Sequence, residues 1–208
     1  MVLAPGYAPL SFTAPEPGSY ALPAMGSAAD GAVIDSDGNS AQLHDFLGGK
    51  PTVMSFIFTT CDDVNGCPLA TYVMRSVQDA LRADPATADK ARLVSFSFDP
   101  VFDTPDVIDA YGSQFRAGDF DWQFLTTEGA TTLDPILNAY GQWVIRDYDE
   151  NGEYMGTMSH ILRVFLIDES RQIRNIYSTS FLHADTVAND VRSLLMEATA
   201  ATSADTGS

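Results

Sequence analysis

Basic residues are scarce in this chain. Its 208 residues include 11 lysines and arginines against 28 aspartates and glutamates, and the only lysines are Lys50 and Lys90. The resulting net charge of −17 repels phosphates, which argues against nucleic acid and anionic membrane surfaces as ligands. The charge is compatible with a basic protein partner or a cation as cargo, and equally with a solvated acidic shell suited to a salty environment.

Long apolar runs are also missing. No segment approaches the roughly 18 apolar residues of a membrane span, and the N-terminus lacks the basic-then-apolar pattern of a secretory signal. We therefore expect a soluble chain, with membrane association only through a leader or anchor that is not in this sequence. A chain of 208 residues, 45% of them hydrophobic, can bury a single core without metal or disulfide help.

Cysteine and histidine are among the rarest residues. The chain has two cysteines, Cys61 and Cys67, and three histidines, His44, His160 and His183. A single pair of cysteines is neither a disulfide framework nor a four-ligand zinc pattern, and the scattered histidines argue against a zinc finger. The pair alone does not fix the redox compartment.

The composition predicts three regions. Residues 1–27 are rich in proline, which predicts an extended, non-helical lead-in. Residues 28–196 alternate strand and helix patterns and form the expected domain. Residues 197–208 are small and polar, which predicts a flexible tail.

Hydrophobic periodicity within residues 28–196 predicts a fold of the α/β class. Helices are expected after the cysteines, from Pro105 with Thr104 as N-cap, over 133–140 and over 184–198. Strands are expected at 32–34, 52–58, 92–98, 122–125, 162–167 and 173–177, with a hairpin across the Asn151-Gly152 turn. This order predicts a thioredoxin-like fold, in which helices flank a central mixed β-sheet with an added N-terminal β-hairpin.

The two cysteines follow the apolar run 52–58 on a short loop, and a helical pattern comes next. A helix N-terminus stabilises thiolates, so both are candidates for reactive or metal-binding sulfur. Asp62 and Asp63 should disfavour a thiolate unless a cation compensates, which predicts a poor nucleophile and a better metal site. The plainest alternative is a structural disulfide closing this loop, worth about 2 kcal/mol.

His160 lies just before the predicted strand 162–167. In a thioredoxin-like sheet the start of that strand lies beside the cysteine loop, so the imidazole could approach both sulfurs. Two thiolates and one imidazole suit Cu(I) and could accept Cu(II). A lone histidine is more often a surface or capping residue, and we treat His44 and His183 as such. Strand packing is the simpler explanation for Met155 and Met158.

Several segments together resemble the Sco/SenC family, the copper-handling assembly proteins of cytochrome oxidase. They are Phe56-Ile57-Phe58-Thr59-Thr60-Cys61, Cys67-Pro68, the run from Val94 to Pro105, Trp122-Gln123-Phe124-Leu125-Thr126, and His160 with Phe165-Leu166-Ile167-Asp168. The resemblance implies that Cys61, Cys67 and His160 are copper ligands, and that the protein works outside the cytoplasm after a signal or anchor. One departure is that the family has three residues between its cysteines and this chain has five.

The leading hypothesis is a copper metallochaperone that delivers its ion to an oxidase subunit or another cuproenzyme. An alternative is a thiol-disulfide reductase, in which Cys61 and Cys67 form a redox-active pair served by a thiol reductant and keep a partner's copper-site cysteines reduced. A redox or copper sensor, or a module with a structural disulfide, also stays open. General thiol oxidoreductases of this fold have a cis-proline where this chain has Ser159-His160-Ile161, which favours metal binding.

Overall fold

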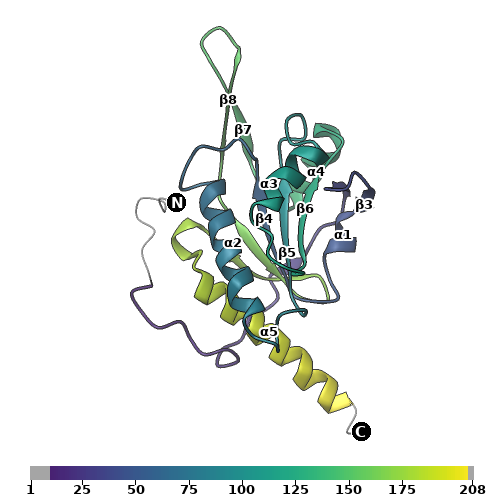
Figure 1. Cartoon of the computed structure of the whole chain (residues 1–208), viewed down its shortest axis with the longest axis vertical. Coiled ribbons are helices and arrows are strands. Elements are labelled where there is room, and N and C mark those ends of the chain that lie inside the picture. Colours follow the sequence, from purple (N-terminus) through teal and green to yellow (C-terminus); the bar gives the residue numbers. More distant parts are fainter. Residues whose placement is uncertain (1–9, 206–208) are drawn as a thin grey trace.

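The computed structural model describes residues 10–205, whose centre is an eight-stranded sheet in the order β1-β10-β9-β4-β5-β6-β2-β3 (Figure 1). Its strands are β1 (Gly26–Ser27), β2 (Ala32–Asp35), β3 (Ser40–Gln42), β4 (Thr52–Ile57), β5 (Arg92–Ser97), β6 (Trp122–Thr126), β9 (Val164–Ile167) and β10 (Gln172–Tyr177). The helices are α1 (Leu43–Phe46), α2 (Cys67–Arg82), α3 (Pro105–Ser113), α4 (Ala130–Ala139) and α5 (Ala184–Asp205), with a 3₁₀ turn at Thr179–Phe181.

The sheet is mixed, as the sequence predicts. Strands β4, β5 and β6 run parallel, whereas β9 pairs antiparallel with β4 and β2 pairs antiparallel with β6. The expected N-terminal hairpin is β2–β3, which extends the sheet beyond β6. All six residues of β4 are buried, because helices cover both faces of a central strand and leave no solvent side.

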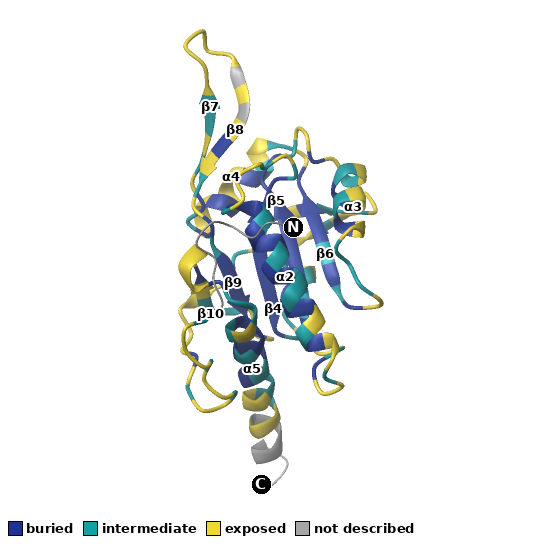
Figure 2. Ribbon diagram, turned by 60° about the vertical axis from the view of Figure 1, so that its left-hand side comes forward, coloured by how far each residue is buried: buried dark blue, intermediate teal, exposed yellow. Residues whose placement is uncertain are grey.

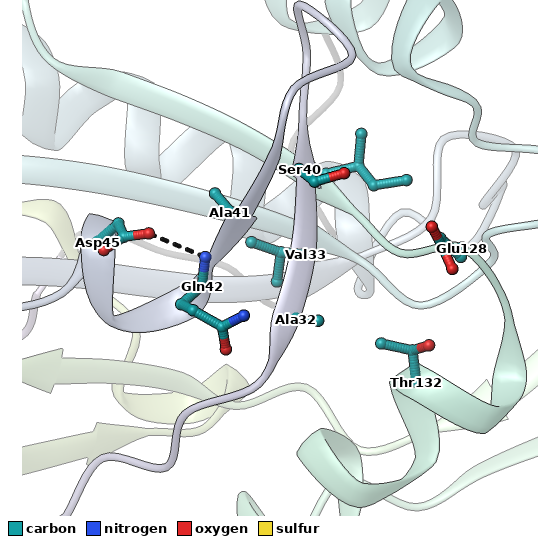
Figure 3. A pocket seen from close by; sticks show the side chains of 9 residues that line it. Ala32, Val33, Ser40, Ala41, Gln42, Asp45, Glu128 and Thr132 are labelled. Atoms are coloured by element: carbon teal, nitrogen blue, oxygen red, sulfur yellow. Dashed lines mark hydrogen bonds between the residues drawn. The ribbon is translucent and has the colours of Figure 1, made fainter.

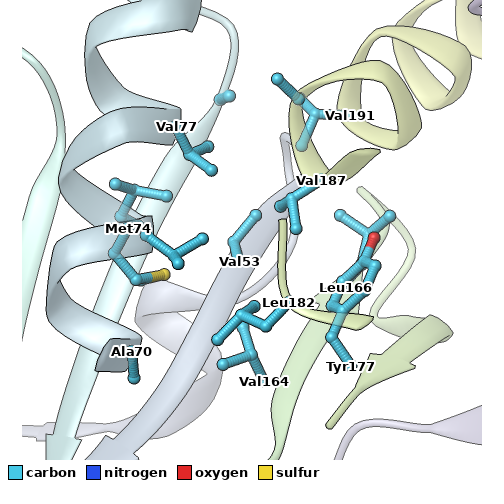
Figure 4. Packing of buried hydrophobic residues seen from close by; sticks show 14 of the residues in the cluster. Val53, Ala70, Met74, Val77, Val164, Leu166, Tyr177, Leu182, Val187 and Val191 are labelled. Carbon is cyan, nitrogen blue, oxygen red and sulfur yellow. The ribbon is translucent and has the colours of Figure 1, made fainter. Parts of the chain in front are cut away.

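Alternate residues of β4 enter two separate hydrophobic cores. Val53 joins a core under α2 and α5, where Met74, Val77, Val187 and Val191 interdigitate (Figure 4). Met54 and Phe56 join the core on the opposite face, which contains residues of α1 and α4. Figure 2 shows the result, a dark blue block of buried central strands within a more exposed shell. These buried strands fix the ends of β4 and β5. The cysteine loop follows β4, and the segment that leads to α3 follows β5.

A second, two-stranded sheet stands off the body of the molecule (Figure 1). It is the hairpin of β7 (Val144–Tyr148) and β8 (Tyr154–His160), which turns at the predicted Asn151-Gly152. Gly152 has a φ of 81°, which glycine adopts at no steric cost. The turn chemistry therefore identified the hairpin, although β8 continues two residues past the expected end at Met158 and includes His160.

The C-terminal helix is longer than predicted. Helix α5 continues to Asp205, past the expected end at residue 198, so most of the segment predicted as a tail is helical. This segment contains no glycine or proline, and its alanines have the highest helix propensity of any residue. Residues 206–208, like residues 1–9 of the expected lead-in, lie outside the described part of the chain. Among the residues described, no helix is both long and apolar enough to cross a membrane.

Candidate metal centre

Cys67 is held by the core of the protein. It is the first residue of α2, followed by Pro68 at a position where the missing N–H costs nothing. Its side chain is buried among the hydrophobic residues on one face of the sheet, at 1% exposure. The backbone N–H of Phe58 donates to its Sγ at 3.4 Å. The end of β4 and the start of α2 thus fix this sulfur together.

Cys61 lies on the loop between β4 and α2 and is half-buried. Gly66 allows the loop to close over it, since a Cβ at that position would lie 3.3 Å from the Cys61 Sγ and 3.2 Å from the Asp63 carbonyl oxygen. The loop is braced by its own turn, in which the N–H of Asn65 donates to the Asp63 carboxylate at 3.0 Å. Cys61 and Cys67 are both free thiols, so the alternative of a structural disulfide is not the state described here.

His160 completes the cluster from the base of the β7–β8 hairpin. Its Nε2 lies 3.6 Å from the Cys67 Sγ, and its ring packs 4.8 Å from that of Phe98 and 6.1 Å from that of Phe58, between ring centroids. The two sulfurs and one imidazole nitrogen all lie within 4.8 Å of one another. The structure therefore brings together the three residues that the sequence singled out.

The donor set fits one soft metal ion. Two atoms that each bind the same first-row ion at about 2.3 Å lie at most about 4.6 Å from each other. The three donor atoms here lie within 4.8 Å of one another, so shifts of a few tenths of an ångström would allow all three to bind one ion. Thiolate and imidazole donors select copper or zinc over magnesium or calcium. The three-residue cluster offers low coordination, which zinc rarely accepts in structural sites.

The two thiols differ sharply in acidity. A hydrogen bond from Cys67, opposed by burial and helped by His160, lowers the pKa of Cys61 to about 5. Burial, together with the neighbouring Cys61, raises the pKa of Cys67 well above its usual value. For Cys61, the hydrogen bonds from Cys67 and His160 therefore outweigh the opposing effect expected of Asp62 and Asp63.

Asp103 is a supporting residue that the sequence did not single out. Its carboxylate is fully buried and accepts from the N–H of Thr59 at 3.1 Å, from the Thr59 hydroxyl, and from the Ser97 hydroxyl at 2.5 Å. Burial raises the pKa of Asp103, against the effect of these hydrogen bonds. Thr59 is two residues before Cys61, so Asp103 ties the start of the cysteine loop to the end of β5.

Asp99 connects the same end of β5 to the hairpin. Its carboxylate, 7% exposed, lies 3.7 Å from a guanidinium nitrogen of Arg146 on β7. The N–H of Asp99 donates to the Ser97 hydroxyl at 3.0 Å, and that hydroxyl donates to the Asp103 carboxylate, so Ser97 connects the Asp99 backbone to Asp103. Only their place in the segment from Val94 to Pro105 marked these two aspartates in the sequence.

The other histidines and methionines have separate environments. His44 is half-buried, and its Nε2 lies 3.0 Å from the Ala28 carbonyl oxygen. The carbonyl of His183 accepts from the N–H of Val187 in the first turn of α5. Met158 is buried in a core, as expected from strand packing, whereas Met155 is exposed.

A hollow of about 380 Å³ lies elsewhere, between the β2–β3 hairpin and the start of α4 (Figure 3). Its acidic residues are Asp45 and Glu128. The Asp45 carboxylate accepts from the Gln42 N–H at 2.9 Å, so it caps α1. The hollow carries no cluster of thiols and imidazoles, and the metal centre remains the chemically distinctive site of the described chain.

A thioredoxin-like sheet with a Cys-Cys-His cluster at the end of a central strand defines a class of soft-metal or thiol-active proteins. The model of the SCO1/SenC family matches residues 28–196, and the chain belongs to that family.

Known relatives agree with this placement. The SCO1 protein homolog of Bacillus subtilis is 32% identical over 92 residues, which cover 44% of this chain and 45% of that protein. The chain thus spans about half the length of the curated relatives that it matches. The crystal structure of Arabidopsis thaliana ScoI with copper bound is similar with a TM-score of 0.69 and 20% identity, covering 84% of this chain and 99% of that one.

A third relative bears on thiol chemistry. BsSco is described as having a disulfide switch and as a member of the Sco family of cytochrome c oxidase assembly proteins. Its structure is similar with a TM-score of 0.64 and 21% identity, covering 84% of this chain and 96% of that one. At these identities the solved structures establish the fold, which is the predicted thioredoxin-like one.

Proposed function

We propose that this protein binds copper through Cys61, Cys67 and His160 and delivers it to a cuproenzyme such as cytochrome c oxidase. The observation that carries the proposal is the approach of these two sulfurs and one nitrogen to within 4.8 Å. Membership of the SCO1/SenC family and the copper in the Arabidopsis relative support the choice of ion.

Each ligand has a distinct role in this proposal. The Cys61 thiolate, stabilised by its neighbours and half-exposed, is the first group that an incoming Cu(I) ion meets. Cys67 loses its proton as the ion enters, because thiols bind metals as thiolates. His160 supplies the neutral lone pair of Nε2, which already faces Cys67. Release to a partner reverses these steps.

Anaerobic titration with Cu(I) against a competing chelator tests the ligand set. We expect one ion per chain, and a large loss of affinity in both Cys67→Ser and His160→Ala. His44→Ala is the matched control, since it removes an imidazole outside the cluster, and it should bind copper as the wild type does. Unchanged stoichiometry and affinity in the first two variants would reject the assignment.

A thiol-disulfide reductase is the second candidate, supported by the low pKa of Cys61 and by the disulfide switch described for BsSco. In this reaction the Cys61 thiolate attacks a partner's disulfide and displaces one thiolate. Cys67 then attacks the mixed disulfide, which releases the reduced partner and leaves a Cys61–Cys67 disulfide. A thiol reductant restores the pair.

His160→Ala separates the two candidates. A reductase should keep exchanging thiols in this variant, measured with a mixed-disulfide peptide, while copper binding is lost. A dithiol potential far below that of the compartment would instead make the bond structural.

We also propose that residues 28–196 act as one functional domain outside the cytoplasm. The match of the family model to this range supports the domain. Cell fractionation with an antibody against the chain tests the location, and recovery in the cytoplasmic fraction would contradict it.

A further inference from the structure

A groove of about 360 Å³ runs between α4 and β7. Leu133 and Leu137 of α4 line one side, and Trp143 and Val144 line the other. The two leucines are buried, whereas Trp143 is 66% exposed. The groove therefore has an apolar floor and an aromatic side chain exposed at its edge, a combination typical of sites that bind peptides or other ligands.

Gln142, which also lines the groove, carries an unpaired donor. The residue is only 3% exposed, and its Nε2 has no hydrogen-bond partner among the described residues. A buried amide nitrogen without an acceptor is destabilising, and folded proteins rarely keep one without a reason. This nitrogen has almost no accessible surface, so the side chain must turn toward the groove before an occupant's carbonyl oxygen can accept from it.

The groove is adjacent to the proposed copper centre. Phe98 lines the groove, and its ring also packs 4.8 Å from that of His160. Arg146 lines the groove on the hairpin strand β7, whose partner strand β8 ends at His160. A chain bound there would therefore lie beside the metal ligands, where a protein that receives copper must approach.

The charge favours a basic occupant. Asp134 lines the groove and is exposed, and the whole chain carries a net charge of −17. The one cation of the lining, Arg146, already faces the Asp99 carboxylate at 3.7 Å. A lysine or arginine near Asp134 would gain from the local and the overall field.

We propose that this groove binds an extended, basic segment of the protein that receives copper. The Gln142 side chain turns to donate from Nε2 to a backbone carbonyl of that segment, an apolar side chain packs between Leu133 and Trp143, and a basic side chain approaches Asp134. The occupant's identity as a copper recipient rests on the proposed function, whereas the groove and its ligand chemistry do not.

Two matched peptides test the groove in the metal-free, isotope-labelled protein. The probes are acetyl-Val-Lys-Val-Lys-Val-amide and its counterpart with glutamate in place of lysine. In NMR titrations we expect the basic peptide to shift the signals of the Gln142 side-chain amide and the Trp143 indole. The acidic peptide should bind at least about tenfold more weakly.

Three variants locate the contact. Gln142→Leu removes the donor, and Trp143→Ala removes an exposed side chain that is not needed for folding; each should weaken binding of the basic peptide at least about fivefold. Ile145→Ala is the control, because Ile145 is 65% exposed on the same strand but does not line the groove. It should change the affinity by less than about twofold.

The outcomes separate this proposal from the copper assignment. Copper affinity should be unchanged in Trp143→Ala, because that residue is not a ligand. Equal binding of the two peptides, shifts confined to other surfaces, or no binding at millimolar concentration would overturn the groove proposal while leaving copper binding intact. Binding of the basic peptide by a chain that fails the Cu(I) titration would overturn the occupant's identity as a copper recipient.

Discussion

The two cysteine sulfurs face each other across one site, yet they belong to different parts of the molecule. Cys67 is in the core, held between the end of β4 and the first turn of α2. Cys61 is on a half-exposed loop, and the third donor, His160, comes from a hairpin that stands off the body (Figure 1). One donor is therefore fixed by the fold, and two are carried by segments outside the central sheet.

This difference suits the proposed function, in which the protein binds an ion and then releases it. Segments with few buried contacts can open without unfolding the domain, whereas a core position cannot. The same difference separates the acidities of the sulfurs, since burial raises the pKa of Cys67 while hydrogen bonds lower that of Cys61 to about 5. The core thus supplies one donor, and the loop and the hairpin supply the other two, of which Cys61 is the more acidic thiol.

The largest expected effect is on thiol reactivity. In the metal-free protein at pH 7, iodoacetamide should modify Cys61 roughly 100-fold faster than Cys67, because the thiolate is the nucleophile and Cys67 is also inaccessible. The lower intrinsic nucleophilicity of an acidic thiol offsets only part of this difference. Mass spectrometry of peptides after timed quenching measures both rates.

A matched variant tests the cause. Cys67→Ala removes the main hydrogen bond that lowers the pKa of Cys61, so the midpoint of the Cys61 rate against pH should rise above its wild-type value near 5. Cys67→Ser keeps a donor and should shift this midpoint less. Equal labelling of both cysteines in the wild type would show that the proposed difference between them is wrong.

The next effect concerns how the core holds the start of the cysteine loop. Asp103→Ala leaves the Ser97 and Thr59 donors without their acceptor, so we expect a loss of roughly 1–2 kcal/mol in the free energy of unfolding by urea. This corresponds to about a 5- to 30-fold change in the folded-to-unfolded ratio. Asp106→Ala, an exposed aspartate in the first turn of α3, is the control and should cost less. Equal losses of unfolding free energy in the two variants would show that Asp103 does not hold the start of the cysteine loop.

The fold could be predicted from the sequence because the signals for its helices and strands are local. The apolar run of 52–58, interrupted by Ser55, predicted β4, Thr104-Pro105 placed the start of α3, and Asn151-Gly152 placed a hairpin. It did not predict that this hairpin forms a sheet of its own, because periodicity identifies a strand without naming its partner. The length of α5 was also missed, since small residues such as those of 197–205 form helices or tails depending on their surroundings.

The proximity of Cys61, Cys67 and His160 could be anticipated for a related reason. Cysteine is rare enough here to be noticed, and the predicted order of elements placed His160 near the loop. Asp99 and Asp103 were marked only by their place in the segment from Val94 to Pro105, and nothing in the sequence showed that Asp103 is buried and holds the cysteine loop. Gln142 is similar, because no local signal in the sequence shows that its amide nitrogen is buried and unpaired in the folded structure.

The smallest expected effect concerns the hairpin side of the site. The Arg146–Asp99 pair joins the hairpin to the end of β5 at 3.7 Å, with side chains 33% and 7% exposed. Partly exposed ion pairs contribute about 0.2–1 kcal/mol, so Arg146→Gln should speed amide hydrogen exchange in β7 and β8 by roughly two- to fivefold. Exchange in β4 should stay unchanged, because β4 lies in the buried centre of the sheet.

Arg75→Gln is the control for losing a charge, since Arg75 pairs with Asp79 on the surface of α2, away from the hairpin. If exchange rises equally in β4 and in the hairpin, the pair stabilises the whole domain instead of one segment. If it rises in neither, the hairpin is held by its other contacts. A rise confined to the hairpin means that the position of His160 can be loosened while Cys67 stays in place, which is the asymmetry that an ion-releasing site requires.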